Sequence, residues 1–347
     1  MKLPPVIIRR MLIDPIWIPL ALLLCLGFGV LAIVGVLISP LSRRRPLFRL
    51  AAFAVIYLLL DACLVVCCAG LWLRYPLAGR RDQAQWSATH HALLRRALRL
   101  LVSASRPLFG FELRLQEPPD AERIRGRPLL VLARHGGPGD SFALVDLLMS
   151  RYGKRPAIVL KETLRWDPGL DLLLGRLKTC FIRRGDRARS EARLSNLAKT
   201  LRADEVILLF PEGGNWTPSR HLGSIARLRR AGRHQDAAEA VGNPNVLPPS
   251  PAGILACLRG QADLDILVVA HTGLEDLVSP ALIWRALPVS GHPMIVRWWR
   301  EPGSHLPRGD DGRREWLRLQ WAIVDAWIDS RKASAGSPEA EGFHQPA

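Results

Sequence analysis

The sequence predicts an α/β fold, with a largely parallel central sheet flanked by helices and preceded by two N-terminal membrane helices. Three observations support this class. From about residue 107 onward, short apolar runs alternate with amphipathic stretches, as strands alternate with helices in α/β domains. Two long apolar segments precede that region. Polar stretches rich in glycine follow several of the apolar runs, and such strand ends carry the functional side chains of a parallel sheet.

The two apolar segments predict membrane attachment. The first runs from Ile16 to Pro40 without a charged residue, and at about 1.5 Å per residue it is long enough to cross a hydrocarbon core of roughly 30 Å. The second runs from Leu50 to Leu73 and is interrupted only by Asp61. A carboxylate in lipid is costly unless it is paired or hydrated, so the pair is expected to form either a full or a partly embedded hairpin. We expect the active domain at the cytoplasmic face of the membrane.

These patterns divide the chain into three units. Residues 1–85 are expected to form the membrane-anchoring helical hairpin and a linker, residues 86–333 the main domain, and residues 334–347 a disordered tail. The main domain opens with an amphipathic entry helix, whose apolar stripe includes Leu94 and Leu98. This stripe suits a membrane surface with anionic lipids, and it suits equally a helix packed on the domain with its arginines in water.

The apolar runs define the expected strands and helices. Strands are expected at 128–134, 156–164, 180–184, 206–213, 265–272 and 294–302. Helices are expected at 141–152, 168–177, 186–201, 251–258 and 312–330. The six cysteines have no metal-ligand spacing and are predicted to be reduced, and no metal site is expected.

The charge balance is strongly basic, with 48 Lys and Arg against 31 Asp and Glu and a formal net charge of +17. Such a surface attracts anions, including lipid headgroups, phosphorylated metabolites and nucleic acid. The basic patches are interrupted and no nucleic-acid-binding motif is found, so nucleic acid is not an expected partner. The basic stretch 219–234 either meets phosphates of coenzyme A or of lipid headgroups, or is a solvated helix face.

The stretch ARHGGPGDSF at residues 133–142 places His135 and Asp140 on a bend-prone tether. Imidazole is the usual general base near neutral pH. A carboxylate can hold one ring nitrogen as a donor and leave the other free to accept a hydroxyl proton. Asp140 alternatively caps the helix that follows, but capping explains neither His135 nor the glycines. We therefore predict that His135 and Asp140 form a catalytic dyad.

Two further motifs follow the dyad in order. The stretch FIRR ends at Arg184, and Phe-Pro-Glu-Gly spans Phe210 to Gly213. Together, behind N-terminal apolar helices, the three motifs resemble those of the glycerolipid acyltransferase superfamily, whose best-known class is 1-acyl-glycerol-3-phosphate acyltransferase. The resemblance covers about residues 107–330. It implies a glycerolphosphate acyltransferase-like fold and O-acyltransferase activity.

The resemblance also implies roles for individual residues. His135 and Asp140 would be catalytic, and Arg184 would bind a phosphate of the acceptor through its planar fork of donors. Glu212 and Gly213 would help to shape the acceptor site. A surface ion pair for the arginine and a simple turn for the glutamate are the structural alternatives.

Other basic residues are further candidates for substrate binding. Lys161 stands where the family commonly has a basic residue, although a solvated lysine fits as well. Arg183 alternates to the other strand face from the motif arginine. The family usually continues Glu-Gly with Thr or Ser and then Arg, whereas here Asn215 intervenes and the next arginine is Arg220. The fourth region has VVAHTG in place of the usual proline, and His271 is either an exposed strand-end residue or a second polar group in the pocket.

The expected reaction is transfer of a fatty acyl chain to the hydroxyl of a lysophospholipid, foremost 1-acyl-glycerol-3-phosphate, in phospholipid biosynthesis or remodelling. Acyl-CoA or acyl carrier protein would be the co-substrate, with no separate cofactor, and the membrane and the acyl carrier protein would be partners. Another lyso-lipid or a glycolipid is the alternative acceptor. A membrane hydrolase is a remote alternative, because no G-x-S-x-G motif occurs and Ser141 is the only serine beside the dyad. A non-catalytic basic protein that binds membranes is equally remote.

Overall fold

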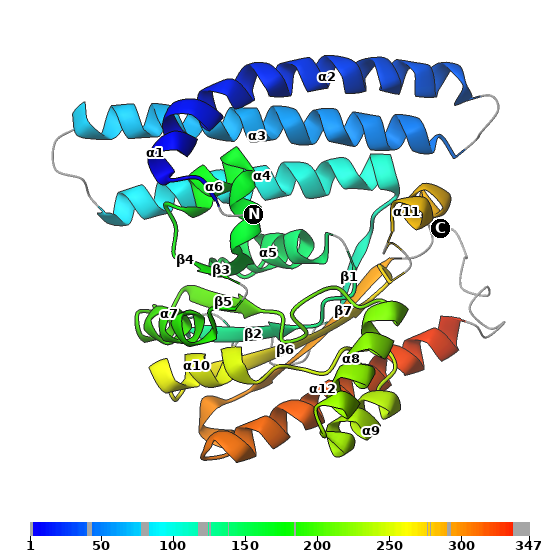
Figure 1. Cartoon of the computed structure of the whole chain (residues 1–347). Helices are drawn as coiled ribbons and strands as arrows, with labels where there is room; N and C mark the ends of the chain where they lie inside the picture. Colours follow the sequence, from blue (N-terminus) through cyan, green and yellow to red (C-terminus); the bar gives the residue numbers. More distant parts are fainter. Residues whose placement is uncertain are drawn as a thin grey trace, which may run out of the picture.

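A computed structural model describes most of the chain. The described residues are 3–39, 44–77, 83–116, 124, 126–137, 139–183, 185–275, 277, 279–289 and 293–335. Seven strands form one sheet in the order β1-β7-β6-β2-β5-β3-β4 (Figure 1). The strands are β1 Leu113–Gln116, β2 Leu129–Ala133, β3 Arg155–Lys161, β4 Thr179–Ile182, β5 Glu205–Leu209, β6 Asp265–Thr272 and β7 Met294–Glu301. Neighbouring strands from β6 to β4 are parallel, and only the β6–β7 pair is antiparallel. The largely parallel sheet is thus confirmed.

The helices before the first central strand are α1 Val6–Ile8, a π-helical turn Arg9–Ile13, α2 Asp14–Leu37, α3 Pro46–Leu77 and α4 Gln83–Phe109. Those between the strands are α5 Asp140–Ser150, a 3₁₀ turn Glu162–Trp166, α6 Pro168–Leu174, α7 Arg187–Lys199, α8 Pro218–Arg230, α9 His234–Gly242, α10 Ala252–Gly260 and α11 Pro280–Ala286. A 3₁₀ turn Gly303–His305 and helix α12 Asp310–Ala335 follow the last strand.

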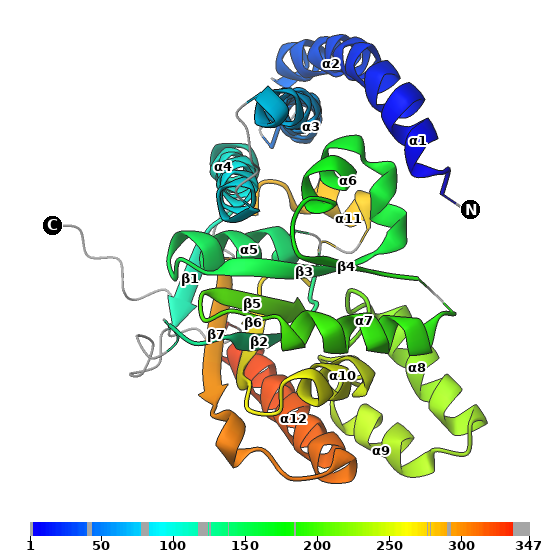
Figure 2. The same cartoon turned by 90° about the vertical axis from the view of Figure 1, so that its left-hand side faces the viewer.

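Helices cover both faces of the sheet, with α4 and α5 on one side and α7, α10 and α12 on the other (Figure 2). The sequence of β2 explains this arrangement, because all five of its residues are buried and apolar. Val131 and Ala133 pack in the same core as α4 and α5, whereas Leu130 and Leu132 pack in the core with α7, α10 and α12. A strand covered on both faces has no solvent-facing side and therefore no polar alternation.

The six predicted strands are found with boundaries shifted by a few residues. Strand β1 was not predicted. Among the described strands, this four-residue edge strand pairs with β7 alone, where Leu113 lies opposite Met294. Its formation depends on a partner 181 positions further along the chain, which a local pattern does not reveal. All six cysteines are free in the structure.

Two helices of the described residues, Val6–Leu37 and Pro46–Arg74, are long and apolar enough to cross a membrane. They lie side by side at the edge of the molecule furthest from α12 (Figure 1). Many apolar side chains of the outer helix face outward, and Leu26 is 71% exposed. A continuous exposed apolar surface of this kind is unfavourable in water and suits contact with lipid.

Asp61, the one acidic residue of the second apolar run, is buried and paired. Its Oδ2 atom accepts a hydrogen bond of 2.5 Å from the Trp17 indole of α2. Its Oδ1 atom lies so close to Gly169 of α6 that a Cβ there would approach it to 2.0 Å. Asp61 therefore joins the hairpin to the main domain and is shielded from the surrounding medium.

Buried ion pairs attach the hairpin at a second point. The Asp171 carboxylate of α6 lies 2.8 Å from Arg9, 2.9 Å from Arg10 and 2.7 Å from Arg165. The side chains of Asp171 and Arg9 are 1% and 5% exposed. The hairpin and the main domain are therefore in direct polar contact.

The entry helix α4 packs between α3 and α5. Leu94 and Leu98 of its apolar stripe are buried, whereas Arg95, Arg96 and Arg99 are exposed. Of the two predicted alternatives, the structure has the helix packed on the domain. At the other end of the chain, α12 extends to Ala335, and the rest of the predicted tail lies outside the described residues.

Candidate active site

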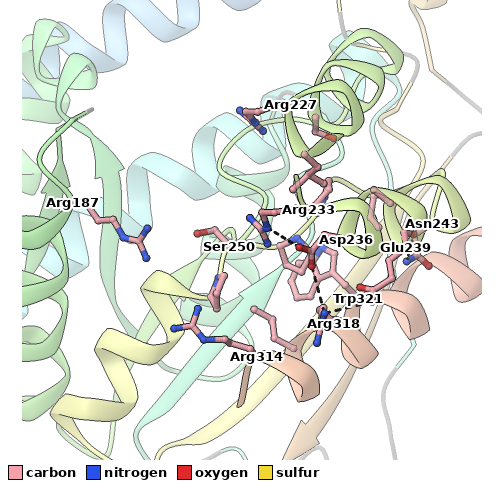
Figure 3. Close-up of a pocket in the computed structure, with 18 residues that line it drawn as sticks. Arg187, Arg227, Arg233, Asp236, Glu239, Asn243, Ser250, Arg314, Arg318 and Trp321 are labelled. Carbon is pink, nitrogen blue, oxygen red and sulfur yellow. Dashed lines mark hydrogen bonds and ion pairs between the residues drawn. The ribbon is translucent and has the colours of Figure 1, made fainter. Parts of the chain in front are cut away.

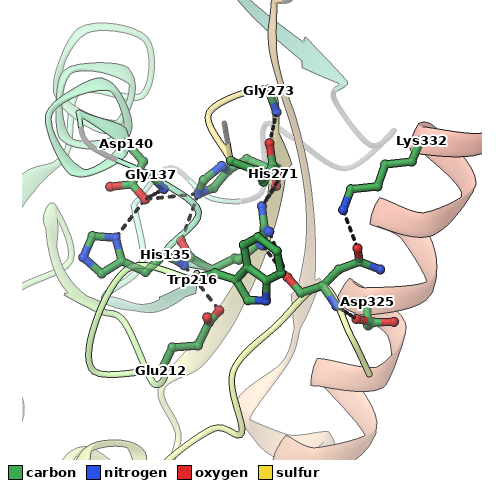
Figure 4. A network of polar contacts seen from close by, with 12 residues as sticks. His135, Gly137, Asp140, Glu212, Trp216, His271, Gly273, Asp325 and Lys332 are labelled. Atoms are coloured by element: carbon green, nitrogen blue, oxygen red, sulfur yellow. Dashed lines mark hydrogen bonds and ion pairs between the residues drawn. The ribbon is translucent and has the colours of Figure 1, made fainter. Parts of the chain in front are cut away.

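The carboxyl end of β2 and the start of α5 bring the predicted dyad together. Nδ1 of His135 lies 2.8 Å from Oδ2 of Asp140 (Figure 4). The connecting bend depends on its glycines. Gly139 has a φ of 89°, in the left-handed region that favours glycine. At Gly137 a Cβ would lie 2.3 Å from the carbonyl oxygen of Leu274, so no side chain fits there.

The Asp140 carboxylate is fully buried and accepts several hydrogen bonds. Oδ1 accepts from the backbone N–H and the hydroxyl of Ser141, at 2.5 and 3.0 Å. Oδ2 accepts from His135 and, at 3.3 Å, from the N–H of Gly137. Burial alone would raise the pKa of Asp140, but the interactions with His135 and His271, foremost their hydrogen bonds, outweigh it and hold that pKa well below its usual value. Asp140 is therefore an anion at neutral pH.

Asp140 is not the N-cap of helix α5, so the helix-capping alternative is wrong. The N-cap of α5 is Gly139, and Asp140 is the first residue of the helix itself. Its carboxylate is instead committed to the imidazole and the bend, which leaves the dyad as its principal interaction.

The orientation of His135 makes its second nitrogen available. Because Nδ1 faces a carboxylate, it carries the hydrogen, and Nε2 holds a lone pair. Within the described part of the chain no hydrogen bond engages Nε2. The His135 side chain is 20% exposed, and the Phe210 ring packs against the imidazole at a centroid distance of 4.4 Å. A hydroxyl that reaches Nε2 can therefore give up its proton to it.

Glu212 follows β5 and connects three segments of the site. Its Oε1 atom accepts from the His135 backbone N–H and from the Trp321 indole of α12, both at 3.3 Å, and Oε2 accepts from the Leu247 N–H at 3.1 Å. Burial raises the pKa of Glu212 to about 7, although the nearby Arg134 and these three donors lower it. The carboxylate thus holds the backbone of the site in place, and the next residue, Gly213, is exposed with a φ of 70°.

The Arg220 side chain contacts the loop that follows Glu212, although Arg220 comes later in the sequence than the arginine of the family motif. Its guanidinium Nη1 donates to the carbonyl oxygen of Asn215 at 2.9 Å. The side chain is exposed at the start of α8. A basic group thus borders the Phe-Pro-Glu-Gly loop, although it comes five positions later in the chain than the family pattern implies.

Two other residues predicted to bind substrate, Lys161 and Arg183, lie at the carboxyl ends of strands further along the sheet. Lys161 ends β3 and is exposed, and Arg183 follows β4 with its guanidinium 3.7 Å from Glu162. Strand β5 separates β3 and β4 from β2, so neither side chain joins the dyad. The motif arginine, Arg184, lies outside the described residues.

His271 is part of the site, so the exposed alternative is wrong. It lies on β6, is fully buried, and its Nε2 atom is 3.5 Å from Oδ2 of Asp140.

Arg134, a neighbour of His271, was not predicted to belong to the site, and it is also fully buried. The Arg134 guanidinium donates to the carbonyl oxygens of Asn245 and His271, both at 2.8 Å, and to Glu275. An arginine next to the motif histidine was the only sequence signal, and it does not indicate burial.

An apolar cavity of about 350 Å³ adjoins the bend that carries the dyad. It lies between α3, α4, α5 and α11, and its wall includes Gly139, Phe142 and Ala143 at the start of α5. The remaining lining residues are Leu50, Phe53, Tyr57, Leu101, Val102, Ser105, Phe109, Phe111, Leu274, Leu277, Ile283, Leu287 and Val289. A cavity of this shape and chemistry suits a hydrocarbon chain.

A second cavity, of about 500 Å³, lies between α8, α9 and α12, next to the start of α7 and the segment 248–251 (Figure 3). Five arginines line it: Arg187, Arg227, Arg233, Arg314 and Arg318. Asp236 and Glu239 partly neutralise them, since Arg233 pairs with Asp236 at 2.6 Å. Trp321 lines this cavity and also donates to Glu212. Because Glu212 binds the His135 backbone, Trp321 connects the basic cavity to the dyad. Among the described residues, no group of three or more His, Cys, Asp or Glu side chains is placed to hold a metal ion.

Comparisons with known proteins agree with this geometry. Residues 117–244 match the family model described as Acyltransferase, and this range contains the three motifs. No curated protein sequence matches the chain. Among solved structures, the chain is similar to the 1-acyl-sn-glycerophosphate (LPA) acyltransferase PlsC from Thermotoga maritima, with 14% sequence identity and a TM-score of 0.50. The match covers 82% of this chain and 98% of that chain.

The fold, the motifs and the family match define an O-acyltransferase. More narrowly, residues 117–244 carry the acyltransferase domain, and the fold is similar to that of a solved 1-acyl-sn-glycerophosphate acyltransferase.

Proposed function

We propose that this protein is a membrane-bound acyltransferase that esterifies a lysophospholipid, with 1-acyl-glycerol-3-phosphate as the preferred acceptor. One observation carries the proposal. His135 and Asp140 lie 2.8 Å apart on a bend whose Gly139 lines an apolar cavity of about 350 Å³, together with Phe142 and Ala143 of α5. A general base beside a space for a hydrocarbon chain is what acylation of a lipid alcohol requires.

The reaction follows from the orientation of the dyad. The acceptor hydroxyl gives its proton to Nε2 of His135 while its oxygen attacks the thioester carbonyl. Asp140 stabilises the imidazolium that forms. The carbon–sulfur bond then breaks, the ester is formed, and the leaving thiolate takes the proton from the imidazolium to become a free thiol. No covalent acyl-enzyme is needed.

The named activity of the similar structure, an LPA acyltransferase, supports a phosphorylated acceptor. Arg220, which borders the Phe-Pro-Glu-Gly loop, would supply a phosphate contact. Asn215 beside it departs from the family pattern, and this departure supports another lyso-lipid or a glycolipid as the second candidate acceptor.

The donor would be acyl-CoA or acyl carrier protein. The arginine-lined cavity behind Glu212 supports a phosphorylated donor, because guanidinium groups bind phosphate bidentately. The helices α8, α9 and α12 that line this cavity lie on the other side of the sheet from the apolar hairpin (Figure 1), which favours a ligand that arrives from water.

Attachment to a membrane rests on the hairpin, whose outer helix has an exposed apolar surface. A cytoplasmic active domain agrees with a donor taken from the cytoplasm. Membrane flotation of the full chain, with and without alkaline carbonate extraction, would test the attachment. Protease accessibility of the α8–α9 region in sealed vesicles would test the sidedness.

The hydrolase alternative has little structural support. The Ser141 hydroxyl donates to Oδ1 of Asp140 at 3.0 Å and is thus committed to the carboxylate. A nucleophilic serine would need its oxygen against Nε2 of the imidazole.

Incubation of the purified protein with acyl-CoA and a mixed pool of lyso-lipids, followed by lipidomics, tests the proposal. We expect acylated product from lysophosphatidic acid, with thiol release that depends on the acceptor. Thiol release without an acceptor would favour hydrolysis, and product from a different lyso-lipid alone would reassign the acceptor.

A further inference from the structure

Two imidazoles approach the Asp140 carboxylate, one from each side (Figure 4). His135 reaches Oδ2 from the loop after β2, at 2.8 Å. His271 reaches the same oxygen from β6, at 3.5 Å. A dyad needs only the first of these contacts, so the second calls for an explanation.

The neighbours of His271 assign its hydrogen. Nε2 lies 3.0 Å from the carbonyl oxygen of Arg134, an atom that only accepts hydrogen bonds. Nε2 therefore carries a hydrogen, and this hydrogen is shared between the carbonyl and Oδ2 of Asp140. Nδ1 of His271 is buried and has no hydrogen-bond partner among the described residues. A neutral ring with its hydrogen on Nε2 avoids a buried, unpaired N–H at Nδ1.

The ring is held in this orientation by close packing. Its residue is fully buried on β6, and the Arg134 guanidinium binds its backbone carbonyl at 2.8 Å. At Gly136 a Cβ would lie 2.8 Å from Cε1 of His271, so the bend between His135 and Asp140 packs directly against the ring. The donor is therefore preorganised and does not depend on a bound substrate.

We propose that His271 is a positioning residue of the acyltransferase: its Nε2–H fixes Oδ2 of Asp140 in line with Nδ1 of His135 and shares the charge of that carboxylate. The inference rests on the proposed function. It differs from the dyad itself because His271 acts through the Asp140 carboxylate and not directly on the acceptor hydroxyl.

The proposal predicts a particular effect on pH dependence. The charged groups around the dyad are Arg134, Glu212 and Glu275, and the last pairs with Arg134. When His271 no longer donates, the Asp140 carboxylate interacts more strongly with a protonated His135. The acid limb of the kcat/KM profile should then move to higher pH, by up to about one unit. The looser carboxylate should lower kcat about tenfold, in keeping with one lost hydrogen bond to a charged group.

The test compares three substitutions in the full chain in detergent. His271→Leu removes the donor, and His271→Asn keeps polarity but ends too short to reach Oδ2. His271→Gln carries an amide N–H close to the position of Nε2. We expect the first two to lower kcat and to move the acid limb, with KM for lysophosphatidic acid and acyl-CoA changed by less than about twofold. His271→Gln should recover most of both properties. His305→Leu, which changes a histidine that is 68% exposed, is the control.

The experiment distinguishes a wrong positioning role for His271 from a wrong proposed function. If the unmodified protein transfers no acyl group, the function itself is wrong. If the protein is active and His271→Asn keeps the normal kcat and pH profile, the positioning role is wrong. It is equally wrong if His271→Gln is as impaired as His271→Asn while both melt at the normal temperature. Should His271→Leu not fold, the Asn and Gln pair still decides the matter.

Discussion

Nδ1 of His135 and Oδ2 of Asp140 lie 2.8 Å apart, although a glycine-rich bend of four residues separates them in the chain. The bend closes because Gly139 adopts a left-handed conformation and Gly137 packs against the Leu274 backbone. A base and the carboxylate that orients it are thus supplied by one loop at the edge of the sheet.

Removal of the dyad should abolish transfer while the protein remains folded. We expect His135→Ala to lower kcat by at least about 10²-fold, because the hydroxyl loses its general base. Asp140→Asn should have a loss of similar or larger size, because the imidazole is no longer held in the correct tautomer. Thiol release from acyl-CoA with lysophosphatidic acid measures both, with His305→Ala as the exposed control. Normal activity in His135→Ala would exclude the mechanism.

The buried Glu212 should make stability depend on pH in a defined way. Its pKa is raised from 4.5 to about 7, so between these values the folded protein binds more protons than the unfolded chain. The stabilisation it contributes is complete below pH 4.5 and is lost as the pH rises through 7. Relative to Glu212→Gln, the native protein should therefore lose up to about 3 kcal/mol of unfolding free energy between pH 5 and 8.

Chemical denaturation at those two pH values measures the effect of Glu212→Gln. Glu315→Gln, which changes an exposed carboxylate on α12, is the matched control and should show no such difference. An unfolding free energy difference between native protein and Glu212→Gln that is the same at pH 5 and 8 would contradict the assignment.

Narrowing the apolar cavity should change which acyl chains are used. Ala143 is buried at the start of α5 and lines the cavity next to the dyad bend. In Ala143→Phe the larger side chain occupies space that a long chain needs. We expect the longest chains to lose at least about tenfold in kcat/KM, on the scale of a few lost methylene contacts, while short chains are retained. Competition between acyl donors and lyso-lipids of graded length measures this, with the exposed Leu222→Phe as control. A uniform loss at all lengths would indicate general damage.

Substitution of arginines in the basic cavity should weaken donor binding selectively. Arg227 and Arg314 line this cavity, whereas Arg229 is exposed on the same helix as Arg227 and does not line it. In the double variant Arg227→Glu, Arg314→Glu we expect a KM for acyl-CoA raised about tenfold or more, with kcat little changed, because repulsion replaces a phosphate contact. Arg229→Glu should have a small effect. An unchanged KM for acyl-CoA would show that the donor binds elsewhere.

Breaking the buried ion pairs should loosen the hairpin. Asp171→Asn leaves Arg9, Arg10 and Arg165 without their shared carboxylate. Loss of one partner of a buried pair costs about 3–5 kcal/mol. We therefore expect a lower melting temperature and faster proteolysis between the hairpin and the main domain. Asp186→Asn, which removes only an exposed pair with Arg189, should behave normally. Equal proteolysis rates in the two variants would contradict this role for the ion pairs.

Local patterns were sufficient for much of this protein. Runs such as Leu129–Ala133 are apolar throughout, because a strand covered on both faces has no polar side, and so six strands in a largely parallel sheet could be predicted. The dyad was equally accessible, since both partners lie within one short bend. The apolar hairpin was evident from length and composition alone.

Other structural features depend on contacts between segments that lie far apart in the chain, and local sequence patterns do not predict such contacts. Edge strand β1 exists because β7 pairs with it. His271 was ambiguous because a histidine at a strand end can face water or a carboxylate, and only the alignment of β6 beside β2 brings it to Asp140. Arg134 and Glu212 resembled ordinary charged residues, yet their partners come from the segment around Asn245 and from α12. Composition and short-range order therefore specify the fold class and the dyad, whereas the surroundings that tune the dyad depend on long-range packing.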